Sequence, residues 1–433
     1  MVVRYKTDFD KFVIVSSCER RGWVRTTPDN SDDWDLYWSN VHTAKQIFLP
    51  ENGLRLEPHQ FINHFPNHYE LTRKDLMVKN LKRYQKQVKK EGGDTAALDF
   101  MPTTYMMPQD YSLFVEEFRR STNVAWIMKP ACKAQGKGIF LINKLAQVKK
   151  WARAAGNARE KDQQENYVIS RYIDNPLLIG DKKFDLRLYV VVLSYRPLKV
   201  YLSNMGFARF CNIKYTTEMS ELDNQFVHLT NVAIQKRGVK YNSLHGNKWP
   251  LADLRLFLEG VRGLEATEAL FAGLEQIIVN SLKAVQNVLI NDPHCFELYG
   301  YDIIIDDTMK PWLIEVNASP SLSTTTKADR LMKCKIIHDT LSLVAPQDGV
   351  RAPTRPRSAP AHLPRHHDAQ PLPGASRAST PKRVGCMALL YDETEALERG
   401  RARRDAQLVS NAHRRSKRQT MLGYMDRPAS AHP

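Results

Sequence analysis

The stretch that decides the fold runs from Cys295 to Ser321 and reads CFELYGYDIIIDDTMKPWLIEVNASPS. It contains two apolar runs, Cys295–Ile305 and Lys310–Val316, separated by Asp306-Asp307. Apolar runs of this length bounded by turn residues are typical of short strands. The stretch therefore predicts a β-hairpin.

The polar residues of this hairpin fall where a metal ion could bind. Side chains two apart on a strand share a face, so Glu315 and Asn317 point the same way. An antiparallel partner strand would bring Asp302 alongside them. Two carboxylates and a carboxamide are hard oxygen ligands of the kind that Mg2+ accepts. For an isolated pattern, a hairpin with an acidic outer face is the safer interpretation, and the residues upstream decide against it.

A lysine and a glycine-bearing turn precede the hairpin in the chain. Trp126–Pro130 reads as an apolar strand carrying Lys129, and Gln135–Ile142 as a turn with two glycines leading into a second strand. Glycines let the backbone approach a phosphate, and Lys129 would add a charge-assisted contact. A lone GxG is more often a hairpin turn. The chain has neither the Walker A pattern nor the kinase motifs HRD and DFG.

Two further strands carry polar residues between apolar ones. Tyr167–Ile173 alternates and breaks at Asp174, an edge that can offer backbone groups to an adenine. Lys183–Tyr189 alternates strictly, which predicts Lys183, Asp185, Arg187 and Tyr189 on one face. That face could be the solvent side of a strand. The apolar run that follows argues instead that these charges are buried with partners.

Together these motifs resemble the tubulin tyrosine ligase-like family. The resemblance rests on WIMKP, QGKGIF, RYI with NP, KFDLRLYV, HLTN, GYDIIID and WLIEVNASPSL, in the family's order, and extends over roughly residues 22 to 343. Within the family, the chain is most similar to the catalytic subunit of the multi-subunit tubulin polyglutamylase. Three segments favour this branch: Arg20–Trp23, Phe114–Arg119 and Phe226–Gln235. The resemblance implies an α+β or α/β fold of the ATP-grasp type, with ATP between a central and a C-terminal lobe.

The resemblance also implies roles for individual residues. It implies nucleotide contacts for Lys129, Gln135, Gly136, Ser170, Arg171, Tyr172, Ile173, Lys183, Asp185, Thr230 and Asn231, and metal binding for Asp302, Glu315 and Asn317. It implies that Arg209, Lys248 and Lys333 hold the incoming amino acid. Catalytic roles fall to Arg187, which would face the developing anion, to Glu315, which could bridge two ions, and to Gln135, beside the entering acceptor carboxylate.

The implied activity is an ATP- and Mg2+-dependent ligation. ATP would convert the γ-carboxylate of a glutamate in a tubulin C-terminal tail to an acyl phosphate, which free L-glutamate then attacks. The implied partners are tubulin, microtubules and accessory subunits of a polyglutamylase complex, in the cytoplasm and cytoskeleton, with the cilium or flagellum axoneme and basal body as expected places. A glycyl ligase and an inactive microtubule-binding relative remain alternatives. A nucleic-acid binder is suggested only by basicity, without an RRM, KH or helix-turn-helix signature.

Composition agrees with an intracellular enzyme. The 433 residues are 42% apolar, enough for a sizeable core. Six cysteines show no CxxC pair, which argues against a zinc site or a disulfide framework. Without a signal-peptide pattern or a run of about 18 apolar residues, we expect no membrane association. We expect His64 and His68, and likewise His366 and His367, to be solvated rather than metal-bound.

Charge and composition divide the chain into three regions. The net charge is +16, and residues 351–433 hold 16 Lys and Arg against 7 Asp and Glu. We expect an N-terminal mixed lobe at 1–125, the ATP-grasp lobes at 126–345 and a disordered, basic, Pro/Arg-rich tail at 346–433. The remaining element predictions are strands at Phe12–Ser16 and Trp34–Trp38, helices at Lys74–Glu91 and Thr267–Ile290, and a short docking helix formed by Met387–Tyr391 with the acidic stretch that follows.

Overall fold

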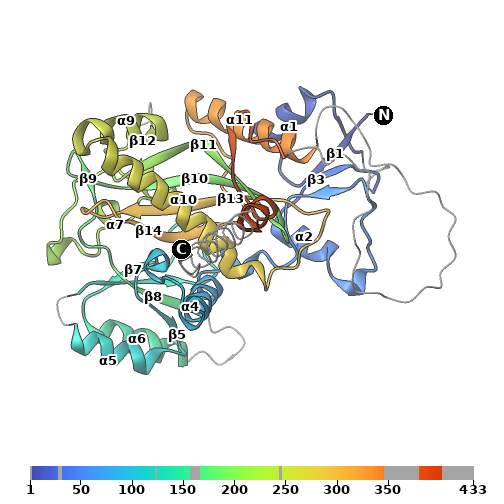
Figure 1. Ribbon diagram of the computed structural model, residues 1–433. Coiled ribbons are helices and arrows are strands. Elements are labelled where there is room, and N and C mark those ends of the chain that lie inside the picture. The colour runs from blue at the N-terminus through green and yellow to red at the C-terminus, as the bar shows by residue number, and fades with distance from the viewer. Residues whose placement is uncertain are drawn as a thin grey trace, which may run out of the picture.

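The structure, a computed structural model, describes residues 2–27, 32–121, 124–156, 166–242, 246–345 and 380–401. Three sheets organise these residues (Figure 1). An eight-stranded sheet lies in the centre, a four-stranded antiparallel sheet lies below it and a four-stranded parallel sheet lies at the right. The mixed α/β organisation predicted from the sequence is confirmed.

The large sheet has the order β14-β13-β10-β11-β16-β15, and its neighbours are antiparallel. The predicted hairpin forms as β13 and β14. The bounds are β10 Lys182–Tyr195, β11 Leu198–Phe210, β13 Glu297–Ile305 and β14 Pro311–Asn317, with β9 Leu178–Ile179 and β12 Lys248–Pro250 paired to β10 and β11.

Alternation along β10 assigns its side chains to two different surroundings. Leu186, Leu188 and Val190 belong to the core under one face, whereas Tyr189 and Val191 belong to the core under the other. Lys183, Asp185 and Arg187 continue the second face. The charged residues therefore occupy one end of a face whose other end is apolar.

Helices cover both faces of this sheet. One core is covered by α4 (Lys74–Lys90), α9 (Leu251–Arg262) and α10 (Leu264–Gln286), and the other by α1 (Phe12–Glu19) and α11 (Lys327–Val344). The predicted helices at Lys74–Glu91 and Thr267–Ile290 are confirmed, the second with shifted ends. In α4, Met77 and Leu81 of the predicted apolar stripe are buried.

The small antiparallel sheet has the order β5-β8-β6-β7 and carries two helices. Its bounds are β5 Thr104–Met107, β6 Trp126–Pro130, β7 Phe140–Ile142 and β8 Tyr167–Arg171, with α5 Tyr111–Arg120 and α6 Leu145–Gly156. Its core centres on Phe114 and Trp126, whose rings meet at 5.2 Å edge to face. The predicted boundary after residue 125 is wrong here, because β5 lies before this boundary and pairs with β8, which lies after it.

The parallel sheet has the order β2-β1-β3-β4. Its bounds are β1 Arg4–Thr7, β2 Val24–Arg25, β3 Leu36–Trp38 and β4 Phe61–Ile62, with helix α2 at Val41–Ile47. The predicted strand at Trp34–Trp38 appears as β3. The predicted strand at Phe12–Ser16 is wrong: that run is the helix α1, because a crossover is needed between the parallel strands β1 and β2.

The expectation that His64 is solvated is also wrong. Ile62, the last residue of β4, forms an isolated parallel bridge with Cys295, which lies two residues before β13. This junction buries His64 completely, and its Nδ1 lies 2.7 Å from Glu297 Oε1, which is equally buried. The neighbouring His68 is largely buried as well, and burial lowers its pKa. His366 and His367 lie outside the described residues.

Part of the predicted tail belongs to the large sheet. Residues 383–384 and 387–392 form β15 (Arg383–Val384) and β16 (Met387–Asp392), and β16 pairs with β11. The predicted docking helix is therefore wrong for Met387–Tyr391, because the free edge of β11 offers unpaired backbone groups that a strand satisfies and a helix does not. The acidic stretch that follows is helical over residues 393–401. The rest of the predicted tail, 346–379 and 402–433, lies outside the described residues.

Short elements complete the part of the chain that the structure describes. These are the helices α3 Tyr69–Thr72, α7 Gln225–His228 and α8 Val232–Gln235, and the 3-10 turns Pro50–Asn52, Ala96–Leu98 and Met219–Glu221.

Candidate functional site

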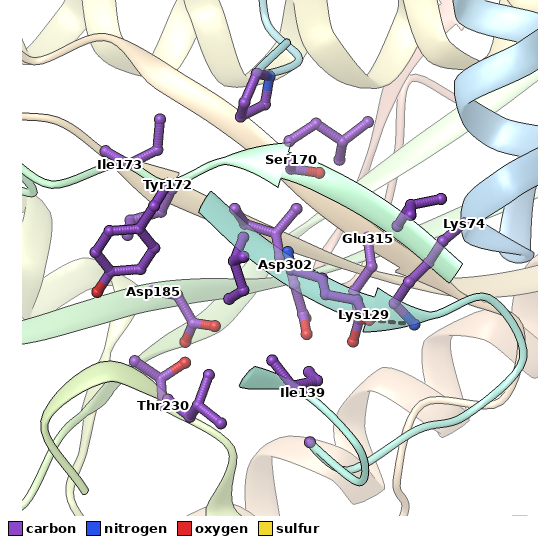
Figure 2. Close-up of a pocket in the computed structure, with 18 of the residues that line it drawn as sticks. Lys74, Lys129, Ile139, Ser170, Tyr172, Ile173, Asp185, Thr230, Asp302 and Glu315 are labelled. Atoms are coloured by element: carbon purple, nitrogen blue, oxygen red, sulfur yellow. Dashed lines mark ion pairs between the residues drawn. The ribbon is translucent and has the colours of Figure 1, made fainter. Parts of the chain in front are cut away.

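A cavity between the small sheet and the large sheet gathers most of the predicted site residues (Figure 2). Every residue predicted to contact the nucleotide lines it, and so do two of the predicted metal ligands: Lys129, Gln135, Gly136, Ser170, Arg171, Tyr172, Ile173, Lys183, Asp185, Thr230, Asn231, Asp302 and Glu315. Arg187, Arg209, Lys248, Lys333 and Asn317 are not among its lining residues.

The acidic side of the cavity is built by the β13–β14 hairpin. Asp302 and Glu315 are direct cross-strand partners, and a bulge follows this pair. Asn317, two residues on, donates from Nδ2 to Glu315 Oε1 at 3.4 Å and to the Gly300 carbonyl at 3.3 Å. The hairpin thus brings the three predicted metal ligands together.

Three lysines from three elements line the same cavity as these acids. Lys129 comes from β6, Lys183 from β10 and Lys74 from the first turn of α4. Burial lowers the pKa of Lys129 and that of Lys183 to about 8, with Glu315 and other acids opposing the shift at Lys129. Lys74 Nζ lies 2.9 Å from Glu315 Oε2 and also donates to the Lys133 carbonyl at 3.1 Å. Sequence reasoning missed Lys74, because a single lysine at a helix start has no distinguishing pattern.

A hydrogen-bonded chain fixes Lys183 in place. Its ammonium donates to the Tyr172 hydroxyl at 2.7 Å, and that hydroxyl lies 2.9 Å from His228 Nδ1. Since an ammonium can only donate, the Tyr172 proton goes to Nδ1, and Nε2–H donates to the Glu221 carbonyl at 3.0 Å. Burial and the nearby Lys183 lower the pKa of His228 to about 4, which keeps this imidazole neutral. His228 was not predicted as a site residue, although it begins the HLTN motif.

The loop after β6 has the backbone that its glycines suggested. Gln135 and Gly136 adopt left-handed conformations with φ of 63° and 78°. A Cβ at Gly136 would lie 2.5 Å from Ile234 Cδ1 and 3.1 Å from Asn231 Oδ1. Gly136 is therefore required twice, for its torsion angle and for its close approach to α8.

Next to the acids of the hairpin, two buried arginines form ion pairs with two aspartates. Arg187 donates to both oxygens of Asp302, at 2.5 and 3.0 Å, and Arg209 donates to both oxygens of Asp185, at 2.7 and 2.5 Å. Arg209 also lies 2.8 Å from Asp302. Burial alone would raise the pKa of Asp302, but the two arginines hold it well below its ordinary value. Removing one partner of such a buried pair costs about 3–5 kcal/mol.

The other predicted amino-acid ligands meet at a third group, which we name the Asp329 bridge (Lys248, Asp329 and Lys333). Lys248 Nζ lies 3.0 Å from Asp329 Oδ2, and Lys333 Nζ lies 3.2 Å from Oδ1. Lys248 is the register partner of Arg209, so the bridge adjoins the arginine–aspartate pairs. Burial lowers the pKa of Lys333 to about 8. Asp329 itself was not predicted, because the sequence pattern around it is that of an ordinary first helical turn.

The acids of the hairpin suit a hard divalent cation. Among the described residues there is no cluster of three His, Cys, Asp or Glu with metal-binding geometry, so a site here depends on the amide of Asn317 beside two carboxylates. The low pKa of Asp302 keeps it charged, and Glu315 is partly exposed to the cavity. Two carboxylates with an amide oxygen match Mg2+ with water and phosphate completing its shell.

Comparisons with known proteins converge on one family. The model of the tubulin-tyrosine ligase family matches residues 53–353. The chain is 50% identical over 407 residues to a probable alpha-tubulin polyglutamylase Ttll1 of Tetrahymena thermophila, covering 91% of this chain and 94% of the relative. It is 44% identical to a probable tubulin polyglutamylase TTLL9 of Bos taurus, covering 79% of each. It is 36% identical to the tubulin polyglutamylase TTLL5 of Homo sapiens, covering 80% of this chain and 26% of that protein.

Proposed function

The chain belongs to the tubulin-tyrosine ligase family, and we propose that it is an ATP- and Mg2+-dependent ligase that adds L-glutamate to γ-carboxylates of glutamates in tubulin C-terminal tails. The observation that carries the proposal is the cavity in which buried lysines face the acids of the β13–β14 hairpin. Close relatives named tubulin polyglutamylases support both the enzyme class, a ligase, and the substrate.

ATP would lie between the two sheets that form the cavity. Ser170 to Ile173 at the end of β8 would hold the adenine, and Lys129, Lys183 and the Gln135-Gly136 loop would hold the phosphates. Lys74 would also lie near the phosphates, because its ammonium contacts the Glu315 carboxylate at the same cavity. Cations preorganised in a buried site stabilise developing charge without reorganisation. This arrangement fits the ATP-grasp type of fold.

Asp302, Glu315 and Asn317 would hold the metal. A bound Mg2+ neutralises phosphate charge and orients the transferred group. Lys74 now occupies Glu315 Oε2, so the ammonium has to shift along its flexible side chain when a cation shares that carboxylate. The arginines keep Asp302 ionised throughout.

The reaction follows from the need for a leaving group. Transfer of the γ-phosphoryl group to the acceptor carboxylate releases ADP and forms an acyl phosphate. The neutral amine of the free amino acid then attacks the acyl carbon, an amide bond forms, and inorganic phosphate leaves with the carbon–oxygen bond electrons. Arg187, fixed against Asp302, would stabilise charge on the acyl group, and Gln135 would lie beside the entering carboxylate. No step requires a nucleophilic cysteine.

The relatives favour glutamate over glycine, because the names they carry are those of polyglutamylases. They disfavour an inactive microtubule-binding relative, and so does the retention of the buried lysines and acids, which a scaffold does not need. No helix in the described ranges is both long and apolar enough to cross a bilayer. A cytoskeletal location follows from the substrate, with cilia or flagella as the expected place and accessory subunits as expected partners.

One assay tests the function. Purified tubulin is incubated with the full chain, ATP, Mg2+ and either labelled L-glutamate or labelled glycine, with and without a cell extract that supplies accessory subunits. We expect glutamate transfer to tubulin tails that requires both ATP and Mg2+. Transfer of glycine alone would move the chain to the glycyl ligases, and ATP-independent microtubule binding without transfer would support the inactive relative.

A further inference from the structure

The carboxylate oxygens of the β13–β14 hairpin are already contacted by donors from the protein. Arg187 donates to both oxygens of Asp302, and Asn317 donates to Glu315 Oε1 at 3.4 Å. The remaining oxygen, Glu315 Oε2, lies 2.9 Å from Lys74 Nζ, and a dashed line marks this ion pair in Figure 2. A metal ion at the hairpin therefore has to replace one of these donors.

Lys74 is the donor best suited to leave. The planar fork of Arg187 is held by two hydrogen bonds, whereas the Lys74 ammonium is a point charge on a flexible side chain with three N–H donors. It also donates to the Lys133 carbonyl at 3.1 Å, in the segment that leads to the Gln135-Gly136 loop. Lys74 thus stands between the acids of the hairpin and the loop that we propose binds the phosphates.

The charge of the cavity disfavours a cation that arrives alone. Five of the side chains that line the cavity are lysine or arginine, and three are aspartate or glutamate. Two of these acids, Asp185 and Asp302, are also paired with buried arginines. Like charges about 4 Å apart repel by about 4 kcal/mol near a protein surface. A nucleotide triphosphate, by contrast, brings the negative charge that this excess of cations can bind.

We propose that Lys74 gates the metal site: its ammonium holds Glu315 Oε2 until nucleotide phosphates take it over, so that a divalent cation binds tightly only together with the nucleotide. The exchange keeps the Glu315 carboxylate paired at each stage, and an unpaired buried carboxylate is costly. By linkage, each ligand raises the affinity for the other by the same factor. The proposal rests on the proposed function, because it couples the nucleotide and metal sites of that reaction.

The test removes the gate and measures metal binding without nucleotide. Mn2+ is titrated into the full chain, and the free ion is read by electron paramagnetic resonance. The wild-type protein should bind Mn2+ weakly. Lys74→Met should lower the Kd of Mn2+ roughly tenfold to a hundredfold, the range of ordinary couplings between sites. The same variant should bind a non-hydrolysable ATP analogue more weakly in the presence of Mn2+, because a phosphate ligand is lost.

These opposite signs distinguish a gate from simpler roles of Lys74. A residue that only bound phosphate would leave the affinity for Mn2+ alone unchanged, and a structural residue would weaken both ligands. Lys129→Met removes a charge from the same cavity but leaves the Lys74–Glu315 pair, so its gain in Mn2+ affinity should be smaller. Lys79→Met, on the exposed side of α4, should change neither affinity.

A double variant shows where the ion binds. Combining Lys74→Met with Glu315→Gln should abolish the gain in Mn2+ affinity, since the released carboxylate is gone. Thermal unfolding checks that each variant folds. If Lys74→Met does not fold, Lys74→Gln takes its place, because its amide can still donate to Glu315 but carries no charge.

Three results would overturn the gate. They are tight Mn2+ binding by the wild-type protein without nucleotide, no gain in a folded Lys74 variant, and an equal gain in Lys129→Met. Because Mn2+ binding is read without tubulin, amino acid or turnover, a failure of tubulin ligation leaves this result interpretable.

Discussion

The two edges of the eight-stranded sheet are built in opposite ways. At one edge, β13 and β14 are joined by a short turn and place Asp302 opposite Glu315 in the cavity. At the other edge, β11 pairs with β16, which comes from about 190 residues further along the chain. The first edge carries charged side chains that line the cavity, whereas the backbone of the second edge is paired by another strand of the same chain.

The second edge is held by contacts that only the folded chain can make. The Cys386 amide donates to Asp339 of α11 at 2.7 Å, and the Tyr201 hydroxyl donates to the Pro381 carbonyl at 2.9 Å. Met387 is fully buried in the core that α1 and α11 cover. The sheet thus has charged residues at the cavity along one edge and a stabilising strand along the other. We expect variants at the first edge to lose ligation activity and variants at the second to lose stability.

The largest effect is expected at the chemical edge. Glu315→Gln keeps the shape of the side chain and removes one negative charge from the predicted metal site. We expect ligation to fall roughly a hundredfold to a thousandfold, as when a main electrostatic contributor is removed. Rates are measured with labelled glutamate and tubulin, and thermal unfolding checks that the fold persists. Glu268→Gln, on the exposed side of α10, is the matched control. Near-normal ligation by a folded Glu315→Gln protein would refute the metal assignment.

Changes at the other edge, where β16 pairs with β11, should lower the stability of the protein instead. A chain that ends at residue 379 loses β15 and β16, which uncovers Tyr201 and empties the position of Met387. We expect the free energy of unfolding to fall by at least about 3 kcal/mol, the scale for emptying a core methionine position. Denaturant titration measures it.

The control for this truncation is a chain that ends at residue 401, which keeps both strands. Equal stability of the two truncated proteins would show that β15, β16 and the helix at 393–401 together add no net stability.

A third variant tests the Gln135-Gly136 loop, which we propose binds the phosphates. Gly136→Ala forces a Cβ onto a left-handed residue and within 2.5 Å of Ile234 Cδ1. We expect nucleotide affinity to weaken about tenfold, because the strained loop moves away from the phosphates and costs about 1–3 kcal/mol. Fluorescence titration with an ATP analogue measures the affinity. Gly260→Ala in α9, where a Cβ meets nothing within 4 Å, should leave it unchanged.

The smallest effect is a pH dependence of the same binding. Lys129 and Lys183 have pKa values lowered to about 8, mainly by burial. Their charged forms bind phosphate, so affinity should be full below pH 8 and fall severalfold as pH rises through that value. Titrations between pH 6.5 and 9.5 follow it. Lys129→Arg should reduce the pH dependence to the part that Lys183 contributes, since arginine stays charged. A profile that is flat in the wild-type protein would argue against both lysines as phosphate ligands.

Much of the β13–β14 edge could be predicted, because the sequence patterns that specify it are local. The hairpin needs only the alternation and turn within Cys295–Asn317, and its register then places Asp302 opposite Glu315. The residues predicted to contact the nucleotide come from motifs that each occupy a few positions, and all of them line one cavity. Lys74 and His228 escaped prediction, since each acquires its role from a partner on another element, Glu315 for one and Tyr172 for the other.

By itself, the sequence determined which residues alternate, turn and carry charge, because these properties depend on neighbours a few positions away. Only the tertiary structure decided what each charge meets. It turned Phe12–Glu19 into a crossover helix, joined β5 to β8 and seated Met387–Asp392 beside β11. It also left the Tyr189 hydroxyl and Asp329 Oδ1 without hydrogen bonds amid buried cations. Burial and pairing arise from contacts between distant segments, and these depend on the whole core.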